Sequence, residues 1–373
     1  MKLAVVFDDL IQHGGAEKLL LSVMEVFPQA PLYVPLMSKE WEHALHEKNF
    51  CVCTSFMQKL PFKKKLNRFY SVLGLHILAF ENFDFSQFDV VLSISARYAH
   101  GIITKPKTKH ICYMNSPGRM FWDTDSYFEG EKFLTRLFSF LLQPFLSHVR
   151  NWDFIVSKRV DCFVANSPIP RRRIAKYYKR DSDIIFPPVE FPKTIIAPSL
   201  GENYFLIVTR LLPWKKVDIA IKACASEKRF LKIVGEGPAK NRLQKLVKRL
   251  GATDFIEFTG YVSEDEKWAL LQNCSAFIMT QEEDFGIAPL EAMSLGKPVI
   301  AYKKGGALVY VKPHETGIFF EEQTPESLVV ALQKFDNAHF SADSCKRQSQ
   351  RFAKEKFQEK IRDIVNKVYY SMI

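Results

Sequence analysis

The chain has 373 residues, of which 47% are hydrophobic, and a formal net charge of +11, which fits two domains with hydrophobic cores. No apolar run reaches the roughly 18 residues that span a bilayer, and the N-terminal run meets Asp8 too soon for a signal peptide, so we expect neither segment. The seven cysteines stand at irregular spacings, so we expect free thiols in a reducing, cytoplasmic compartment rather than a zinc site.

Residues 3–7 form a short apolar run that predicts a buried strand, and apolar residues at helical spacing follow from Leu19 onward. Between the two lie Gly14 and Gly15, where the absence of a Cβ lets the backbone come close to a ligand. The stretch lacks the third glycine of a dinucleotide-binding fingerprint. A purely structural turn is the alternative interpretation of the glycine pair.

Residues 57–70 contain basic side chains, no acidic one, and several large apolar side chains. A segment of this kind can lie on an anionic membrane surface, which would make the protein peripheral on the inner face of a membrane. Contact with an RNA backbone and a solvated helix face are the alternatives.

Two further predicted strands, over residues 88–94 and 111–113, precede a polar segment with Asn115, Arg119 and Asp123. The Asn115 amide can hydrogen-bond a hydroxyl group but cannot serve as a base at neutral pH. Arg119 offers a cation for phosphates or for an acceptor, and an ion pair with Asp123 is the structural alternative.

The proline-rich stretch 186–192 fits neither a helix nor a central strand, so we expect a connector there. Strands and helices alternate beyond it, which predicts an α/β fold with a parallel, doubly wound sheet whose ligands bind at the carboxyl ends of the strands. We expect an N-terminal Rossmann-like domain over 1–186, a linker over 187–203, a C-terminal ligand-binding domain over 204–345, and a last helix within 346–373.

Arg210 and Lys215 follow the first strand of the second half and therefore point to that carboxyl edge. Two fixed cations at such a place suit a diphosphate. Surface cations that precede a helix are the alternative.

A second polar loop follows the predicted strand 276–279, with Glu283 in the loop and Glu291 in the first turn of a helix. The backbone amides of Phe285, Gly286 and Ile287 lie between the two carboxylates, where free amides favour phosphate. Carboxylates on both sides can accept hydrogen bonds from diols, so the stretch predicts a sugar-nucleotide site. Stabilisation of the helix dipole is the alternative.

The order Glu-Asp-Phe-Gly, four residues, and then Glu-Ala-Met resembles the signature of the retaining family-4 glycosyltransferases, which have the GT-B architecture of two Rossmann-like domains facing across a cleft. By resemblance, Glu283 approaches the transferred sugar and Glu291 holds the nucleotide ribose. Arg210 and Lys215 then hold the donor diphosphate, although Lys216 stands where that family has glycine.

The resemblance also places Gly15 near the donor phosphates and Gly14 on the acceptor side, and it implies that the last helix crosses back to the first domain. The segment from Asn115 to Asp123 resembles a bacterial mannosyltransferase-like branch, with Asn115 at that branch's histidine position and Arg119 towards the acceptor. If this histidine is a base in relatives, the chain replaces it with a group that is not. A front-face mechanism, in which the departing phosphate takes the proton, tolerates that loss.

The resemblance therefore implies metal-independent transfer of a hexose, with mannose favoured, from a GDP- or UDP-linked sugar. The acceptor would be a glycan or a polyprenyl-linked glycan, as in polysaccharide biosynthesis, and we expect no cofactor and no nucleic acid.

Three alternatives are weaker. A metal-dependent GT-A enzyme would use an Asp-x-Asp motif, but residues 123–125 and 181–183 do not follow clean apolar strands. A GT-B sugar-nucleotide epimerase would need proton-transfer groups that no pattern reveals. A non-catalytic membrane- or nucleic-acid-binding protein accounts for the basic runs but not for the ordered cations and glutamates.

Overall fold

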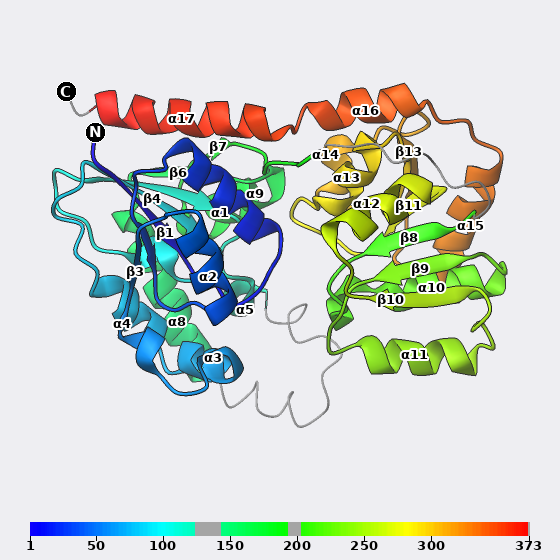
Figure 1. The fold of residues 1–373 in the computed structure, drawn as a ribbon, viewed down its shortest axis with the longest axis horizontal. Helices are drawn as coiled ribbons and strands as arrows, with labels where there is room; N and C mark the ends of the chain where they lie inside the picture. The colour runs from blue at the N-terminus through cyan, green and yellow to red at the C-terminus, as the bar shows by residue number, and fades with distance from the viewer. Residues whose placement is uncertain (124–142, 193–202, 372–373) are drawn as a thin grey trace. The chain divides into compact units, whose positions relative to one another are not determined.

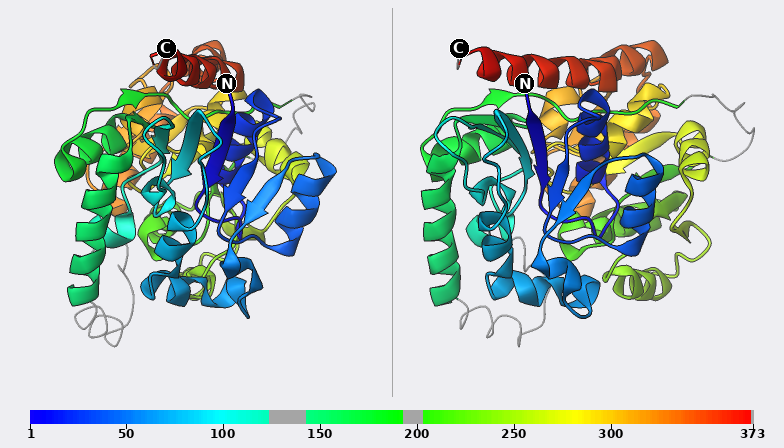
Figure 2. Two further views of the ribbon diagram at one scale, coloured as in Figure 1. Left: turned by 90° about the vertical axis from the view of Figure 1, so that its left-hand side faces the viewer. Right: turned by 60° about the vertical axis from the view of Figure 1, so that its left-hand side comes forward.

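The computed structural model describes residues 1–123, 143–192 and 203–371 (Figures 1 and 2). The chain forms two compact units. The first contains Met1–Pro188 together with Lys354–Ile373, and the second contains Val189–Ala353. Most of the expected linker, residues 193–202, lies outside the described residues. The chain passes back from the second unit to the first at residues 353 and 354, whereas the sequence analysis placed this change at about residue 345.

A parallel sheet of seven strands forms the centre of the first unit, in the order β3-β2-β1-β4-β5-β6-β7. Val5 of β1 lies opposite Leu32 on one side and Leu92 on the other. The strands are β1 (Leu3–Phe7), β2 (Leu32–Val34), β3 (Val52–Thr54), β4 (Val90–Ser95), β5 (Lys109–Met114), β6 (Cys162–Ala165) and β7 (Asp183–Ile184).

Helices connect these strands, as right-handed crossovers between parallel strands require. The described helices of the first unit are α1 (Gly15–Val26), α2 (Lys39–Glu47), α3 (Lys63–Val72), α4 (Leu75–Glu81), α5 (Arg119–Trp122), α8 (Gln143–Val156), α9 (Pro168–Tyr178) and α17 (Lys354–Tyr370), with the short 3-10 helices η1 (Phe56–Lys59), η2 (Ala99–Gly101) and η3 (Ser157–Arg159).

Side chains of the first sheet alternate between two apolar layers, because successive residues of a strand point to opposite faces. Leu3 and Val5 pack with α1, α2 and α17, whereas Ala4 and Val6 pack with α4, α5 and α8. Helix α17 lies along α1 (Figure 1). Its buried residues are Phe357, Ile361, Ile364 and Val365, which recur at helical spacing and so form one apolar face.

The second unit contains a parallel sheet of six strands in the order β10-β9-β8-β11-β12-β13. The strands are β8 (Phe205–Val208), β9 (Leu231–Val234), β10 (Ile256–Gly260), β11 (Ala276–Met279), β12 (Val299–Tyr302) and β13 (Gly317–Phe320). Its helices are α10 (Val217–Ser226), α11 (Lys240–Arg249), α12 (Glu264–Asn273), α13 (Ala288–Ser294), α14 (Ala307–Tyr310), α15 (Pro325–Asp336) and α16 (Ala342–Gln350), with the 3-10 helix η4 (Pro213–Lys215).

Helices α10, α11 and α15 cover one face of the second sheet, and α13 lies on the other face with α12 and α16 beside it. Local sequence signals set the helix ends. Ser263 forms a capping box with Glu266 at the start of α12. Gly296 has a φ of 81° directly after the last turn of α13, where a left-handed residue ends a helix. The predicted fold class, two doubly wound α/β domains, is confirmed.

Candidate functional site

The second sheet reverses its strand order between β8 and β11, the two central neighbours. The connection after β8 leads to one edge of the sheet and the connection after β11 leads to the other. At such a switch point the loops diverge and leave a crevice outside the carboxyl ends of the strands, where ligands of doubly wound folds bind. The loop 209–216 follows β8 and the loop 280–287 follows β11, so both predicted polar loops flank this point.

Lys215 and Glu283 meet at the switch point. The Lys215 Nζ forms an ion pair with the Glu283 Oε1, and the Gln281 Nε2 donates to the same oxygen at 3.2 Å. The two charged side chains are 11% and 18% exposed, so they are largely shielded but reachable. A further hydrogen bond, from the Thr280 Oγ1 to the Lys215 backbone oxygen at 2.9 Å, joins the two loops.

The loop after β8 gives Lys215 a defined position. The Lys215 Nζ lies 4.2 Å from the centre of the Trp214 ring, a cation–π contact. Lys216 follows with a φ of 53°, a left-handed conformation in which a side chain is disfavoured. This finding explains why glycine suits the position in the family that the sequence resembles. Arg210 is exposed in the same loop.

Two glycines after β12 hold the Glu283 loop from behind. The Gly306 amide donates to the Glu283 backbone oxygen at 2.7 Å. A Cβ on Gly305 would lie 2.5 Å from that oxygen, and one on Gly306 would lie 2.1 Å from the Phe285 oxygen. Only glycine therefore allows the two loops to approach this closely.

The next residues of the Glu283 loop are also fixed. The Phe285 ring is buried edge-on against Tyr310 and Phe352, with centroid distances of 5.8 and 5.5 Å. Gly286 has a φ of 88°, and a Cβ there would lie 2.9 Å from the Tyr310 hydroxyl. Ile287 is the N-terminal cap of α13, whose first turn contains a proline, where its missing N–H breaks no helical hydrogen bond.

Glu291 lies in α13 and is only 4% exposed. Its Oε1 accepts a hydrogen bond from the Lys267 Nζ of α12 at 3.0 Å, and the same Nζ contacts the Glu264 Oε2 at 2.7 Å. The sequence analysis missed Lys267. Lys267 directly follows Glu266 of the capping box, and this position does not indicate that its side chain contacts Glu291 of α13.

The first unit holds the predicted acceptor-side residues. Gly14 and Gly15 lie at the start of α1, after β1. Asn115 directly follows β5, and its backbone N–H donates to the Ser95 backbone oxygen at 2.8 Å. These residues therefore share the carboxyl edge of the first sheet.

Arg119 opens the short helix α5. Its Nη2 lies 3.7 Å from the Asp123 Oδ2, with side chains 22% and 33% exposed. The structural alternative for Arg119, an ion pair with Asp123, is therefore present in this conformation.

A polar cluster at the carboxyl ends of β1 and β4 was not predicted. The Asp8 carboxylate accepts four backbone hydrogen bonds, from residues 96 to 99, at 2.6 to 2.9 Å. Asp9 is 2% exposed and accepts hydrogen bonds from the Arg97 Nη2 at 2.6 Å and the Asn67 Nδ2 at 2.9 Å, with the His76 Nε2 at 3.4 Å. Burial alone would raise the pKa of Asp9, but the Arg97 guanidinium and the hydrogen bonds outweigh it and hold the pKa well below its usual range. Two acids directly after a buried strand are its only sequence signal.

Among residues 1–123, 143–192 and 203–371, no group of three or more His, Cys, Asp or Glu side chains is placed to hold a metal ion. One of the discounted Asp-x-Asp motifs, residues 123–125, lies mostly outside the described residues. All seven cysteines are free thiols.

Residues 191–353 match the family model described as Glycosyl transferases group 1. The group 1 match covers nearly the whole second unit, including both loops of the switch point, but less than half of the chain. The chain is similar to a D-rhamnosyltransferase of Pseudomonas aeruginosa, with 27% identity over 227 residues, 59% of this chain and 58% of the relative. It is also similar to a GDP-mannose-dependent phosphatidylinositol monomannoside mannosyltransferase of Mycobacterium tuberculosis, with 33% identity over 147 residues, 36% of this chain and 38% of the relative. The chain thus spans about half the length of the curated relatives that it matches.

Solved structures extend the similarity over both units. The structure of HepE from Anabaena in complex with UDP has a TM-score of 0.73 at 17% identity, covering 98% of this chain and 100% of that chain. The fold of the chain is therefore GT-B, as the motif order implies.

Proposed function

We propose that the protein is a retaining, metal-independent glycosyltransferase that moves a hexose from a nucleoside-diphosphate sugar to a glycan or polyprenyl-linked acceptor. The observation that carries this proposal is the ion pair between Lys215 and Glu283 at the switch point of the second unit, which contains the match to the group 1 family model. A cation for the diphosphate and a carboxylate for the sugar are there in direct contact.

Lys215 can serve both partners at once. An ammonium group has three N–H donors, so one lysine can contact a carboxylate and a phosphate oxygen at the same time. In the proposed complex, Lys215 keeps its contact with Glu283 and also contacts a phosphate oxygen, which orients the sugar and the leaving group relative to each other. Arg210, exposed in the same loop, supplies a second cation for the diphosphate.

The proposed step is a front-face substitution at the anomeric carbon. A bond forms from an acceptor hydroxyl oxygen to that carbon while the bond from the carbon to the diphosphate oxygen breaks, on the same face of the sugar. The electron pair of the broken bond goes to the diphosphate, and the acceptor's proton passes to a phosphate oxygen. Lys215 and Arg210 stabilise the negative charge that develops on the leaving group. Glu283 stabilises the positive charge that develops on the sugar ring.

The nucleotide part of the donor is proposed to lie along the start of α13, with the ribose diol on Glu291. Lys267 fixes the Glu291 carboxylate, which reduces the cost of ordering it for a diol. A GDP-linked mannose is favoured because the mycobacterial relative is described as GDP-mannose-dependent. A UDP-linked hexose is the second candidate, because HepE is described in complex with UDP.

The carboxyl edge of the first unit, with Gly14, Gly15 and Asn115, is proposed to face the acceptor and the donor phosphates. Asn115 would hydrogen-bond an acceptor hydroxyl without taking its proton. An anionic membrane surface is proposed as the place where a polyprenyl-linked acceptor is met. Within the described part of the chain, no helix has the length and apolarity needed to cross a bilayer.

Calorimetric titration with a panel of GDP- and UDP-linked hexoses tests the proposal. We expect one of them to bind and to be consumed when an acceptor is added, with retention at the anomeric carbon. Failure of every sugar nucleotide to bind the folded protein would reject the enzyme.

A matched pair of variants tests the role of Glu291. Glu291→Ala should raise the donor dissociation constant by about tenfold, because a charged hydrogen bond to the ribose is lost. Glu264→Ala removes the other carboxylate of Lys267 and serves as the control. Equal effects of the two variants would show that Glu291 acts only through its contact with Lys267.

A further inference from the structure

Helix α3 has its polar side turned inward and its apolar side turned outward. Asn67, Tyr70 and Ser71 are buried. The large apolar residues of the opposite side are exposed: Phe62 by 72%, Leu66 by 38%, Phe69 by 56% and Leu73 by 55%. These four residues, here called the outer stripe, follow at spacings of four, three and four; Leu66 and Phe69 lie within α3, and Phe62 and Leu73 are its N- and C-terminal caps.

The first residue of the outer stripe is also held in a disfavoured backbone conformation. Phe62 has a φ of 47°, in the left-handed region where a bulky side chain is an outlier. An exposed aromatic residue in such a conformation gains no packing inside the protein. Backbone outliers of this kind point to a function outside the fold.

Lysines surround the start of the stripe. Lys63, Lys64 and Lys65 form the first turn of α3, and the helix contains no acidic residue. Lys64 lies 3.8 Å from Glu40 in an ion pair in which both side chains are 64% exposed, so its charge remains accessible. Lys65 is exposed, and Lys63 is half-buried, with its Nζ donating to the Gln58 backbone oxygen at 3.4 Å. The apolar stripe therefore lies beside a positive patch.

The inner side of α3 is joined to the carboxyl edge of the first sheet. The Asn67 Nδ2 donates to the Asp9 Oδ2 at 2.9 Å, and the Tyr98 hydroxyl donates to the Ser71 backbone oxygen at 3.1 Å. In the views of Figures 1 and 2, α3 lies at the end of the first unit opposite α17. Helix α3 thus contacts Asp9, which directly follows β1 at the carboxyl edge of the first sheet.

We propose that α3 is an interfacial helix that inserts the outer stripe into the leaflet of an anionic bilayer, with Lys63, Lys64 and Lys65 on the lipid phosphates. This inference rests on the proposed function, because membrane binding through α3 would bring the carboxyl edge of the first sheet close to a lipid-linked acceptor. Charge complementarity favours an anionic bilayer as the partner. In a dimer formed through α3, the lysines of the two copies would face and repel one another.

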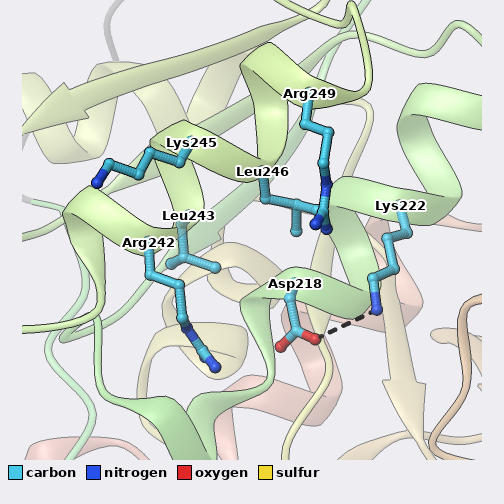
Figure 3. A pocket seen from close by; sticks show the side chains of 7 residues that line it. All are labelled: Asp218, Lys222, Arg242, Leu243, Lys245, Leu246 and Arg249. Atoms are coloured by element: carbon cyan, nitrogen blue, oxygen red, sulfur yellow. Dashed lines mark ion pairs between the residues drawn. The ribbon is translucent and has the colours of Figure 1, made fainter.

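A second positive surface provides the control. Arg242, Lys245 and Arg249 of α11 line a groove towards α10, where Asp218 lies 3.7 Å from Lys222 (Figure 3). The apolar residues of the lining are two leucines, and both are buried. The groove therefore presents charged side chains without an exposed apolar stripe. General attraction of positive charge to lipid would act here as well as at α3.

The test is flotation of the full-length protein with vesicles of equal parts phosphatidylglycerol and phosphatidylethanolamine, and with vesicles of phosphatidylcholine alone. We expect binding to the anionic vesicles at low salt and little binding to the neutral ones. The double variant Phe69→Ser/Leu73→Ser should weaken binding by at least about tenfold. The triple variant Lys63→Gln/Lys64→Gln/Lys65→Gln should weaken it by about fivefold per lysine and remove most of the salt dependence.

Two matched variants must bind as the unchanged protein does. Ile155→Ser/Phe230→Ser removes two equally exposed apolar side chains, and Arg242→Gln/Lys245→Gln/Arg249→Gln removes three charges from α11. The proposal is overturned by undiminished binding of the Phe69/Leu73 variant, by loss of binding in the α11 variant, or by a dimer that forms through the outer stripe in place of vesicle binding. Donor binding measured without vesicles should be unchanged in all variants, so a failure of the proposed sugar transfer is seen separately from a failure of membrane binding.

Discussion

The two units use the same strand order around their central strands but fill the switch point differently. In the first unit, the place between β1 and β4 is filled by the protein's own polar groups, with Asp9 and His76 only 2% and 1% exposed and their neighbour Arg97 26% exposed. In the second unit, the corresponding place between β8 and β11 holds Lys215 and Glu283, which solvent reaches.

This difference teaches that a doubly wound topology supplies a place for a ligand but does not by itself make a binding site. A buried cluster held by its own ion pair and hydrogen bonds stabilises its unit, whereas a partly exposed pair can exchange solvent for substrate. The variants below test the comparison by changing one switch point at a time.

The largest effect is expected from Asp9→Ala in the first unit. The variant leaves the Arg97 guanidinium and the Asn67 amide without their shared acceptor. Breaking a buried pair in this way should lower the free energy of unfolding by about 3–5 kcal/mol, as measured by urea denaturation. A loss below about 1 kcal/mol would mean that the cluster is not structural.

Lys215→Met should have the opposite profile. The rate of sugar transfer should fall by a factor on the order of 100 to 1,000, because charge on the leaving group loses its stabilisation. The free energy of unfolding should fall by less than in Asp9→Ala, since Glu283 keeps 18% of its side chain in solvent and keeps the hydrogen bond from Gln281. Lys222→Met, which removes the exposed partner of Asp218 on the next helix, is the control and should leave the rate unchanged. Equal losses of rate in the two variants would contradict the site.

Part of the pH dependence of the free energy of unfolding should come from a buried histidine of the first unit. Burial lowers the pKa of His110 from 6.5 to about 3. Because the unfolded chain binds the proton at the higher pKa, stability from this group is present above pH 6.5 and is lost as the pH falls towards about 3. The slope should reach about 1.4 kcal/mol per pH unit. Urea denaturation of His110→Gln across that window should give a smaller slope than the unchanged chain, and exposed His43→Gln should not.

The smallest effect is expected from Lys216→Gly. Relief of the left-handed conformation should raise the free energy of unfolding by about 0.5–1 kcal/mol, after the greater chain entropy of glycine is subtracted. Lys179→Gly replaces a lysine with a φ of 56° in the first unit and should give a similar gain. Calorimetry should detect a change in donor affinity only for Lys216→Gly, which alters the loop that holds Lys215.

Much of the second unit follows from the sequence because its signals are local. The strand at residues 276–279 has the predicted bounds, and the loop with Glu283 and the helix with Glu291 follow it as predicted. The meeting of Lys215 and Glu283, 68 residues apart, follows once both are placed after parallel strands, because carboxyl ends share one edge.

The first unit's cluster could not be predicted in this way. Asp9 and Arg97 are 88 residues apart, and no local pattern indicates that Asn67 turns inward from a helix whose apolar residues face outward. The sequence pattern treated that helix as basic and aromatic but could not say which side the protein covers. Lys267 was missed for a related reason, since its contact with Glu291 depends on the packing of α12 against α13.

The return of the chain at residues 353 and 354 has a consequence for synthesis on the ribosome. The apolar layer beneath α1 and β1 stays without its last cover until α17 has emerged, whereas every segment of the second unit has by then been made. The second unit can therefore finish folding before the first unit does. In nascent chains stalled within the second unit, the first unit should remain loosely packed and sensitive to protease, because it lacks α17.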